Sequence, residues 1–114
     1  MLQRTHDAPN GPRSLHVGDL ARLTGIGKAT IEHYLRLGLL RPIGVGPQGY
    51  RRFDAEAVAR IEVVRAGRRA GFGLGEIRAM LAVAEPAELT ELLTTLPPAR
   101  CRAELAARGA PING

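Results

Sequence analysis

The sequence predicts a mainly α-helical fold that includes one small β-hairpin, and three features lead to this prediction. Apolar residues recur at helical spacing in several short segments. Glycine and proline separate these segments, and both are frequent in residues 43–49, between two short segments that are able to extend. With 114 residues, of which 45% are apolar and 24% charged, the chain has the composition of one ordinary globular domain.

The first ordered element is expected to be a short helix. Residues 1–14 mix Pro, Gly, Asn and Asp without an apolar period, so we expect a flexible arm there. Order is expected to begin near Leu15, because Val17 and Leu20 then fall at helical spacing. Residues 24–27, with the sequence TGIG, break this pattern and predict a tight turn.

A second helix is expected to follow this turn at once. Ile31, Tyr34 and Leu35 share one helical face, and Gly38 supplies the left-handed residue that commonly ends a helix. Two short helices joined by a glycine-containing turn of about three or four residues have the outline of a helix-turn-helix.

Residues 39–53 are expected to form the hairpin. Its glycine and proline residues predict a flexible tip, which makes this segment the candidate wing beside the helix-turn-helix. Asp54 then stands at an N-cap position, and a helix is expected from there to about Ala70, with Gly71 ending it. A shorter helix is expected over residues 74–83.

Residues 85–108 are expected to form a short C-terminal helical segment. One side of a helix of about ten residues carries four leucines, Leu89, Leu92, Leu93 and Leu96. Pro97 and Pro98 end this helix, and residues 99–108 form a last amphipathic piece before the tail at 109–114. We expect any self-association to use the four-leucine face, and we expect no small-molecule-sensing domain.

Positive charge is concentrated in one part of the chain. The formal net charge is +5, and residues 13–69 hold 11 basic and 5 acidic side chains, whereas residues 70–114 have a net charge of −1. This asymmetry favours a polyanion as partner, because each phosphate that a cation neutralises releases condensed counterions. Lys28 is the single lysine, and arginine suits phosphate and guanine well, although a GC-rich genome explains the preference for arginine equally well.

The sequence lacks the residues that several classes of function require. The single cysteine, Cys101, and three histidines without paired spacing predict no metal site, and no cofactor is expected. The chain has no nucleophile set beside a base and no phosphate-binding Gly-Lys-Ser/Thr loop, so an enzyme is not expected. No apolar run approaches the roughly 20 residues of a membrane span, and the N-terminus does not resemble a signal peptide, so the protein is expected in the bacterial cytoplasm, at the nucleoid.

Four runs of residues, in order and at compatible spacings, carry a resemblance to a known family. They are LHVGDLARLTGI at 15–26, TIEHYLRLGLLRP at 30–42, GYRRF at 49–53 and GFGLGEI at 71–77. Together they resemble the MerR family of bacterial transcription regulators over roughly residues 15–83. The resemblance implies a winged helix-turn-helix domain at 15–84 that binds promoter DNA sequence-specifically. It also implies a homodimer that acts on RNA polymerase indirectly, by distorting the promoter.

The resemblance also implies which residues meet DNA. Lys28, Thr30, Glu32 and His33 occupy the positions of the recognition helix that face DNA. Tyr34 occupies the position of an aromatic residue that contacts the DNA backbone. Tyr50, Arg51 and Arg52 occupy the wing positions that contact phosphates. His16 is expected to help the amides at the start of the first helix meet a phosphate. Glu32 stands where the family usually has arginine, and His33 where it usually has an aromatic residue. Because glutamate can accept a hydrogen bond from cytosine N4, we expect a different preferred DNA sequence.

Structural alternatives stand beside these assignments. Tyr34 shares the face of Ile31 and is equally compatible with a half-buried core position. His33 is also compatible with a simple exposed position, and Arg51 and Arg52 are compatible with a solvated charge pair. Cations at the end of the third helix are expected to cap a helix end, with DNA contact as the alternative; these are Arg65, Arg68 and Arg69.

Two other functions share the predicted fold. A winged-helix module that binds a protein partner would explain Glu32 as a sign of lost DNA affinity. An architectural or recombination-accessory DNA-binding protein would differ from a transcription regulator only in its target.

Overall fold

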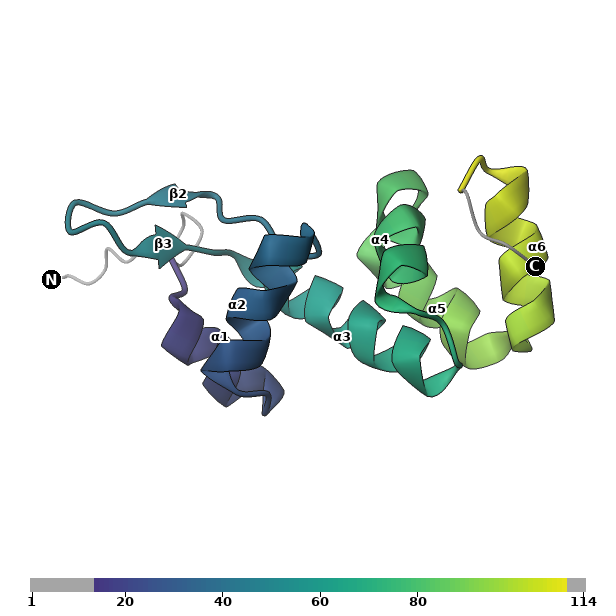
Figure 1. The fold of residues 1–114 in the computed structure, drawn as a ribbon, viewed down its shortest axis with the longest axis horizontal. Helices are drawn as coiled ribbons and strands as arrows, with labels where there is room; N and C mark the ends of the chain where they lie inside the picture. The colour runs from purple at the N-terminus through teal and green to yellow at the C-terminus, as the bar shows by residue number, and fades with distance from the viewer. Residues whose placement is uncertain (1–13, 111–114) are drawn as a thin grey trace, which may run out of the picture.

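The computed structural model describes residues 14–110, which form six helices and a two-stranded antiparallel hairpin (Figure 1). In chain order the elements are α1 (Val17–Thr24), α2 (Lys28–Leu37), β2 (Gly44–Val45), β3 (Arg51–Arg52), α3 (Ala55–Arg69), α4 (Leu74–Val83), α5 (Pro86–Thr95) and α6 (Pro98–Ala107). The expected N-terminal arm lies almost wholly outside the described residues, as does most of the expected tail. The predicted mainly helical, winged helix-turn-helix architecture is confirmed.

The two turns of the helix-turn-helix depend on glycine. Gly25 and Gly38, which follow α1 and α2, adopt φ angles of +82° and +80°. L-residues with a Cβ rarely adopt this left-handed conformation, so glycine ends each helix within one residue. α2 is therefore short, and it begins directly after the turn.

The hairpin is held in place by its return strand. Val45 pairs with Arg51 and Gly44 with Arg52, and the amide of Gly46 donates to the carbonyl of Tyr50 at 2.8 Å. A separate bridge joins Leu15 and Phe53 through two hydrogen bonds of 2.9 and 2.7 Å. Since Leu15 directly precedes α1, this bridge places the start of α1 beside the wing.

α3 connects two hydrophobic cores. Figure 1 shows it in the middle of the molecule, between the helix-turn-helix with its hairpin and the group of α4, α5 and α6. The N-terminal core joins α1, α2 and the first half of α3, and its buried members are Leu20, Ile31, Leu40, Phe53, Ala57 and Ile61. The C-terminal core joins the second half of α3 to α4, α5 and α6 and includes Val63, Val64, Phe72, Ile77, Met80, Leu89, Cys101 and Leu105. The predicted N-cap is present, because the Asp54 side chain accepts from the amide of Glu56 at 3.1 Å.

Arginines of α3 tie it to the preceding elements. The buried Arg60 donates from Nε to the carbonyl of Leu39 at 2.6 Å, and Arg65 donates from Nη1 to the carbonyl of Thr24. Thr24 is the last residue of α1, so Arg65 caps the end of α1 rather than that of its own helix. Arg68 donates from Nη1 to the carbonyl of Phe72 at 3.4 Å, just beyond α3.

The four-leucine face is used inside the chain. Leu89 and Leu93 are buried in the C-terminal core, and Leu92 and Leu96 are half-buried against it. The expectation that this face serves self-association is therefore wrong for Leu89 and Leu93, because both side chains pack against the core between α5 and α3. Burying a leucine side chain contributes about 1.5–3 kcal/mol, so the leucines stabilise the fold itself.

Within residues 14–110, no helix combines the length and the apolar character needed to span a bilayer.

Candidate nucleic-acid interface

A groove of about 540 Å³ lies between the start of α1, the exposed side of α2 and the hairpin. We call it the interface groove. Its lining residues are His16, Val17, Lys28, Glu32, Val45, Gly49, Tyr50 and Arg51. Five of the nine residues predicted to meet DNA therefore gather in one hollow, although they come from three separate elements.

An ion pair crosses the interface groove from α2 to β3. Glu32 Oε1 lies 3.2 Å from Arg51 Nη1, and Oε2 lies 3.3 Å from the same atom. The two side chains are 40% and 47% exposed, so water screens the pair and its contribution to stability is about 1 kcal/mol or less. Neither charge is held there by burial, and an incoming anion can compete with Glu32 for Arg51.

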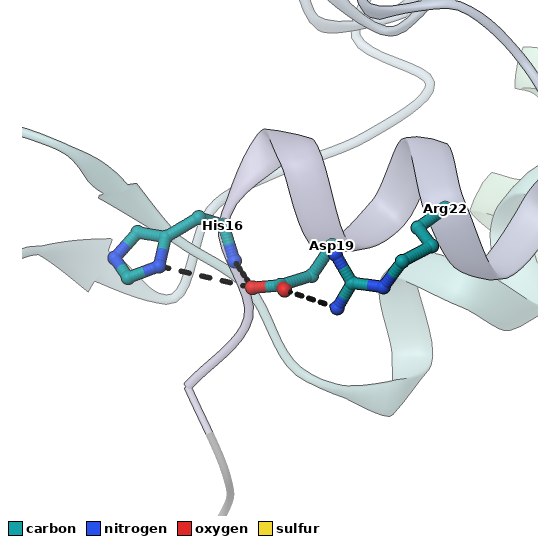
Figure 2. A network of polar contacts seen from close by, with 3 residues as sticks. All are labelled: His16, Asp19 and Arg22. Atoms are coloured by element: carbon teal, nitrogen blue, oxygen red, sulfur yellow. Dashed lines mark hydrogen bonds and ion pairs between the residues drawn. The ribbon is translucent and has the colours of Figure 1, made fainter.

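The amide of His16 at the start of α1 is already occupied (Figure 2). It donates to Asp19 Oδ2 at 2.8 Å, while Asp19 Oδ1 accepts from Arg22 Nη2 at 2.7 Å. The hydrogen bond from His16, followed by that from Arg22, lowers the pKa of the Asp19 carboxyl below its usual range. Asp19 thus supplies the negative charge that favours this helix end, and the expected help of His16 to a phosphate cannot come from its own amide.

The His16 side chain contributes to the groove instead. Its ring meets the ring of Tyr50 edge to face, with centroids 6.3 Å apart and an interplanar angle of 82°. Tyr50 remains 65% exposed. The contact links the start of α1 to the wing by side chains, in addition to the backbone bridge one residue earlier.

Lys28 is the first residue of α2 and is exposed. Its stem runs along α1, since a Cβ built on Gly18 would lie 3.7 Å from Lys28 Cε. The ammonium group therefore sits between α1 and α2, where Lys28 lines the interface groove.

Four predicted residues do not line the groove. Thr30 and His33 are exposed on α2. Tyr34 is half-buried and packs against both cores, which favours the core interpretation of its position. The fourth, Arg52, lies on the opposite face of β3 from Arg51, because successive strand residues point to opposite faces.

Arg52 is folded back onto the hairpin. A Cβ built on Gly44 would lie 3.6 Å from its Nη2, and one built on Gly46 would lie 3.7 Å from its Cδ. Its Nε is buried without a hydrogen-bond partner. Of the two adjacent arginines that the sequence places on the wing, only Arg51 faces α2.

Among residues 14–110, no three His, Cys, Asp or Glu side chains come together in a way that would hold a metal ion.

A family model described as "MerR HTH family regulatory protein" matches residues 15–83, more than half of the chain. The chain belongs to the MerR family of helix-turn-helix regulatory proteins. The resemblance predicted from four sequence runs is thereby confirmed, and the matched region contains both the interface groove and α4.

Relatives of this MerR-family chain include the nodulation protein NolA of Bradyrhizobium elkanii, which is 41% identical over 66 residues. That match covers 58% of this chain and 30% of NolA, so the chain spans less than a third of the length of this relative.

Solved structures of MerR-family regulators share the fold. The HTH-type transcriptional regulator SkgA of Caulobacter crescentus superposes with a TM-score of 0.65 at 28% identity, over 86% of this chain and 70% of SkgA. HiNmlR, a MerR family regulator lacking the sensor domain and solved bound to promoter DNA, has a TM-score of 0.56 at 21% identity, over 84% of this chain and 81% of its own.

Sequence reasoning missed the polar partners in the interface groove. Glu32 and Arg51 lie 19 positions apart on different elements, and only the register of the hairpin against α2 brings them together. The pairing of Asp19 with the amide of His16, in contrast, follows a local spacing of three residues that marks many helix starts.

Proposed function

We propose that this MerR-family chain binds double-stranded promoter DNA sequence-specifically and regulates transcription. In this proposal α2 enters the major groove and the hairpin rests on the flanking backbone. The observation that carries the proposal is the interface groove, where Lys28 and Arg51 face a common hollow from two elements.

The N-terminal part of α2 is proposed to read bases. Recognition helices contact base edges mainly with their N-terminal residues. Lys28 and Thr30 are exposed in the first turn of α2, and His33 is exposed one turn further. Lysine can donate to guanine and threonine to any base, so these side chains have the required chemistry.

The hairpin is proposed to hold the phosphate backbone. Arg51 presents a guanidinium group to the interface groove, and Tyr50 beside it is exposed. Contacts of this kind fix the position of a protein on the duplex and add affinity without reading sequence.

We also propose that the chain acts by binding alone, without catalysis, and that RNA polymerase responds only through the DNA. Promoter sites are commonly palindromic and favour a homodimer. Because Leu89 and Leu93 are buried in the chain's own core, a second copy would have to contact Leu92 and Leu96 of the four-leucine face or another surface.

The test is a titration of the purified protein onto its own promoter region and onto random duplex at several salt concentrations. Regulation of a promoter predicts a preference for the promoter of about a thousandfold or more. Arg51→Ala should weaken binding to every duplex by roughly tenfold and reduce the log-log salt slope by about one unit. Thr30→Ala should change the preference among sequences.

Arg100→Ala is the matched control, because Arg100 is exposed on α6, far along the chain from the interface groove. Equal affinity for promoter and random duplex would favour an architectural DNA-binding protein instead. Affinities that do not respond to Arg51→Ala or Thr30→Ala would refute the assignment of the groove.

A further inference from the structure

A second hollow, of about 460 Å³, lies between the C-terminal end of α2 and α4. Its lining includes four arginines and no acidic residue: Arg36 from α2, Arg41 from the segment after it, Arg60 from α3 and Arg78 from α4. We call it the arginine hollow. Four cations from four segments converge here, although they lie up to 42 positions apart in the sequence.

Most of these arginines lack a carboxylate partner. Within residues 14–110, Arg36, Arg41 and Arg78 form no ion pair, whereas Arg22, Arg51, Arg65, Arg102 and Arg108 each pair with an acidic side chain. Arg60 does have a partner, since its Nη1 lies 3.6 Å from Glu56 Oε2. The hollow therefore keeps an excess of positive charge.

In the described part of the chain, the arginines of the hollow do not donate hydrogen bonds to the last carbonyls of α2. Two carbonyls in the last turn of α2 are satisfied by the backbone rather than by an arginine, because Gly38 donates to Leu35 at 3.1 Å and Leu39 donates to Tyr34 at 2.9 Å. Arg78 crosses this helix end from α4, and a Cβ built on Gly38 would lie 3.7 Å from its Nε. Its guanidinium group is thus held near the end of α2 by packing while its hydrogen-bond donors remain available.

The arrangement carries an electrostatic cost. The Arg60 side chain is only 8% exposed, and burial, followed by the positive charge of Arg41, lowers its pKa below the ordinary value. An anion placed among the four guanidinium groups would relieve this repulsion.

The arginine hollow also connects with the interface groove. A smaller hollow of about 320 Å³ lies between them. It shares Glu32 and Arg51 with the interface groove, and Arg36 and Arg41 with the arginine hollow. Cations therefore line a path from the wing around the side of α2 to α4.

We propose that the arginine hollow binds a phosphate-bearing anion, held by Arg36, Arg41 and Arg78 and supported by Arg60. Planar guanidinium groups form paired hydrogen bonds to phosphate oxygens, which suits both a phosphodiester and a phosphate monoester. The phosphate belongs either to the DNA backbone beyond the interface groove or to a free phosphorylated compound. Only the first source rests on the proposed function.

The first experiment uses inorganic pyrophosphate as the probe and no DNA. Pyrophosphate is titrated onto the full chain by calorimetry and by NMR of the arginine Nε–Hε groups. The signals of Arg36 and Arg78 should shift, and Arg36→Gln or Arg78→Gln should weaken binding by roughly tenfold. Both side chains are exposed, so the variants should remain folded, which circular dichroism checks. Arg100→Gln, which removes an exposed charge on α6, should leave binding unchanged.

The second experiment measures the affinity of the same three variants for duplex DNA. Loss of affinity for promoter and random duplex alike, with a smaller salt slope, would support a DNA phosphate as the occupant. Unchanged DNA affinity with weakened pyrophosphate binding would support a free phosphorylated compound. If Arg36→Gln and Arg78→Gln changed neither, or no more than Arg100→Gln, the proposal would be overturned. A protein that binds pyrophosphate here but no DNA would refute the proposed function and leave the anion site standing.

Discussion

Glu32 of α2 and Arg51 of β3 form an ion pair across the interface groove, with Oε1 of the first 3.2 Å from Nη1 of the second. The guanidinium group of Arg51, which the wing would offer to a phosphate, is therefore already paired with the carboxylate of Glu32. DNA binding at this groove has to break the pair or use it as a unit. Glu32 acts as a charge that lowers affinity in the first case, and as a positioning residue for Arg51 in the second.

Glu32→Gln should raise affinity for duplex DNA of any sequence by roughly three- to tenfold, because it removes both the competitor of Arg51 and a negative charge near phosphates. Fluorescence anisotropy with promoter and random duplexes measures this. Glu91→Gln, an exposed carboxyl on α5, is the control for net charge alone and should have little effect. A fall in affinity for the promoter alone would instead assign Glu32 to base recognition.

Gly67→Ala should destabilise the fold. Gly67 is buried in α3, and a Cβ there would lie 2.7 Å from Cδ1 and 2.8 Å from Cγ1 of the buried Ile77 on α4. Overpacking of this kind costs about 1–3 kcal/mol, against a gain of about 1 kcal/mol or less in helix propensity. We expect a net loss of about 1 kcal/mol in urea unfolding. Gly75→Ala on α4, where a Cβ would meet nothing within 4 Å, should not destabilise and serves as the control.

Stability should depend on pH through Glu76. The hydrogen bond from the amide of Gly73, followed by that from Arg102 at 2.6 Å, holds the pKa of this carboxyl below its ordinary value of 4.5. The unfolded chain therefore binds the proton more readily. The contribution is complete above about pH 4.5 to 5 and is lost as the pH falls through the lower folded pKa.

Glu76→Gln tests this dependence by urea unfolding at several pH values. Since the carboxyl is partly exposed, we expect a loss of about 1 kcal/mol at pH 7. The difference from the unaltered protein should shrink as the pH falls from 5 to 3. A difference that is constant across this range would show that the charge of Glu76 does not matter.

Cys101 should be inert in the folded protein. Its Sγ donates to the carbonyl of Leu92 at 3.1 Å, the residue is buried, and burial raises the pKa of the thiol. Since the thiolate is the reactive form, modification by a disulfide reagent should be on the order of a hundredfold slower in buffer than in urea. Rapid modification in buffer would mean that α6 detaches readily from α5.

The sequence predicts the elements well because their signals are local. A helix end depends on residues within one turn, so Gly38 predicts the end of α2 and Asp54 predicts the start of α3. The four family runs likewise predict the wing beside the helix-turn-helix. The same local signals place Lys28 at the start of α2, where it is exposed.

Packing between elements, in contrast, decided which of these side chains are free to contact DNA or a second copy of the chain. Arg51 and Arg52 are neighbours in sequence, yet the register of a two-residue strand directs the first to Glu32 and the second back onto the hairpin. In the sequence, the four leucines at 89–96 resemble a surface for a second copy, but in the structure the core beside α3 covers Leu89 and Leu93.

The sequence by itself therefore determined the order of the helices, their ends and the family, because helix periods and caps act over a few residues. Only the tertiary structure decided which charges are paired and which remain open. The arginine hollow shows why: Arg36, Arg41, Arg60 and Arg78 meet only after α4 has packed beside the end of α2. Electrostatic interactions depend on distance in space, which spacing along the chain does not report.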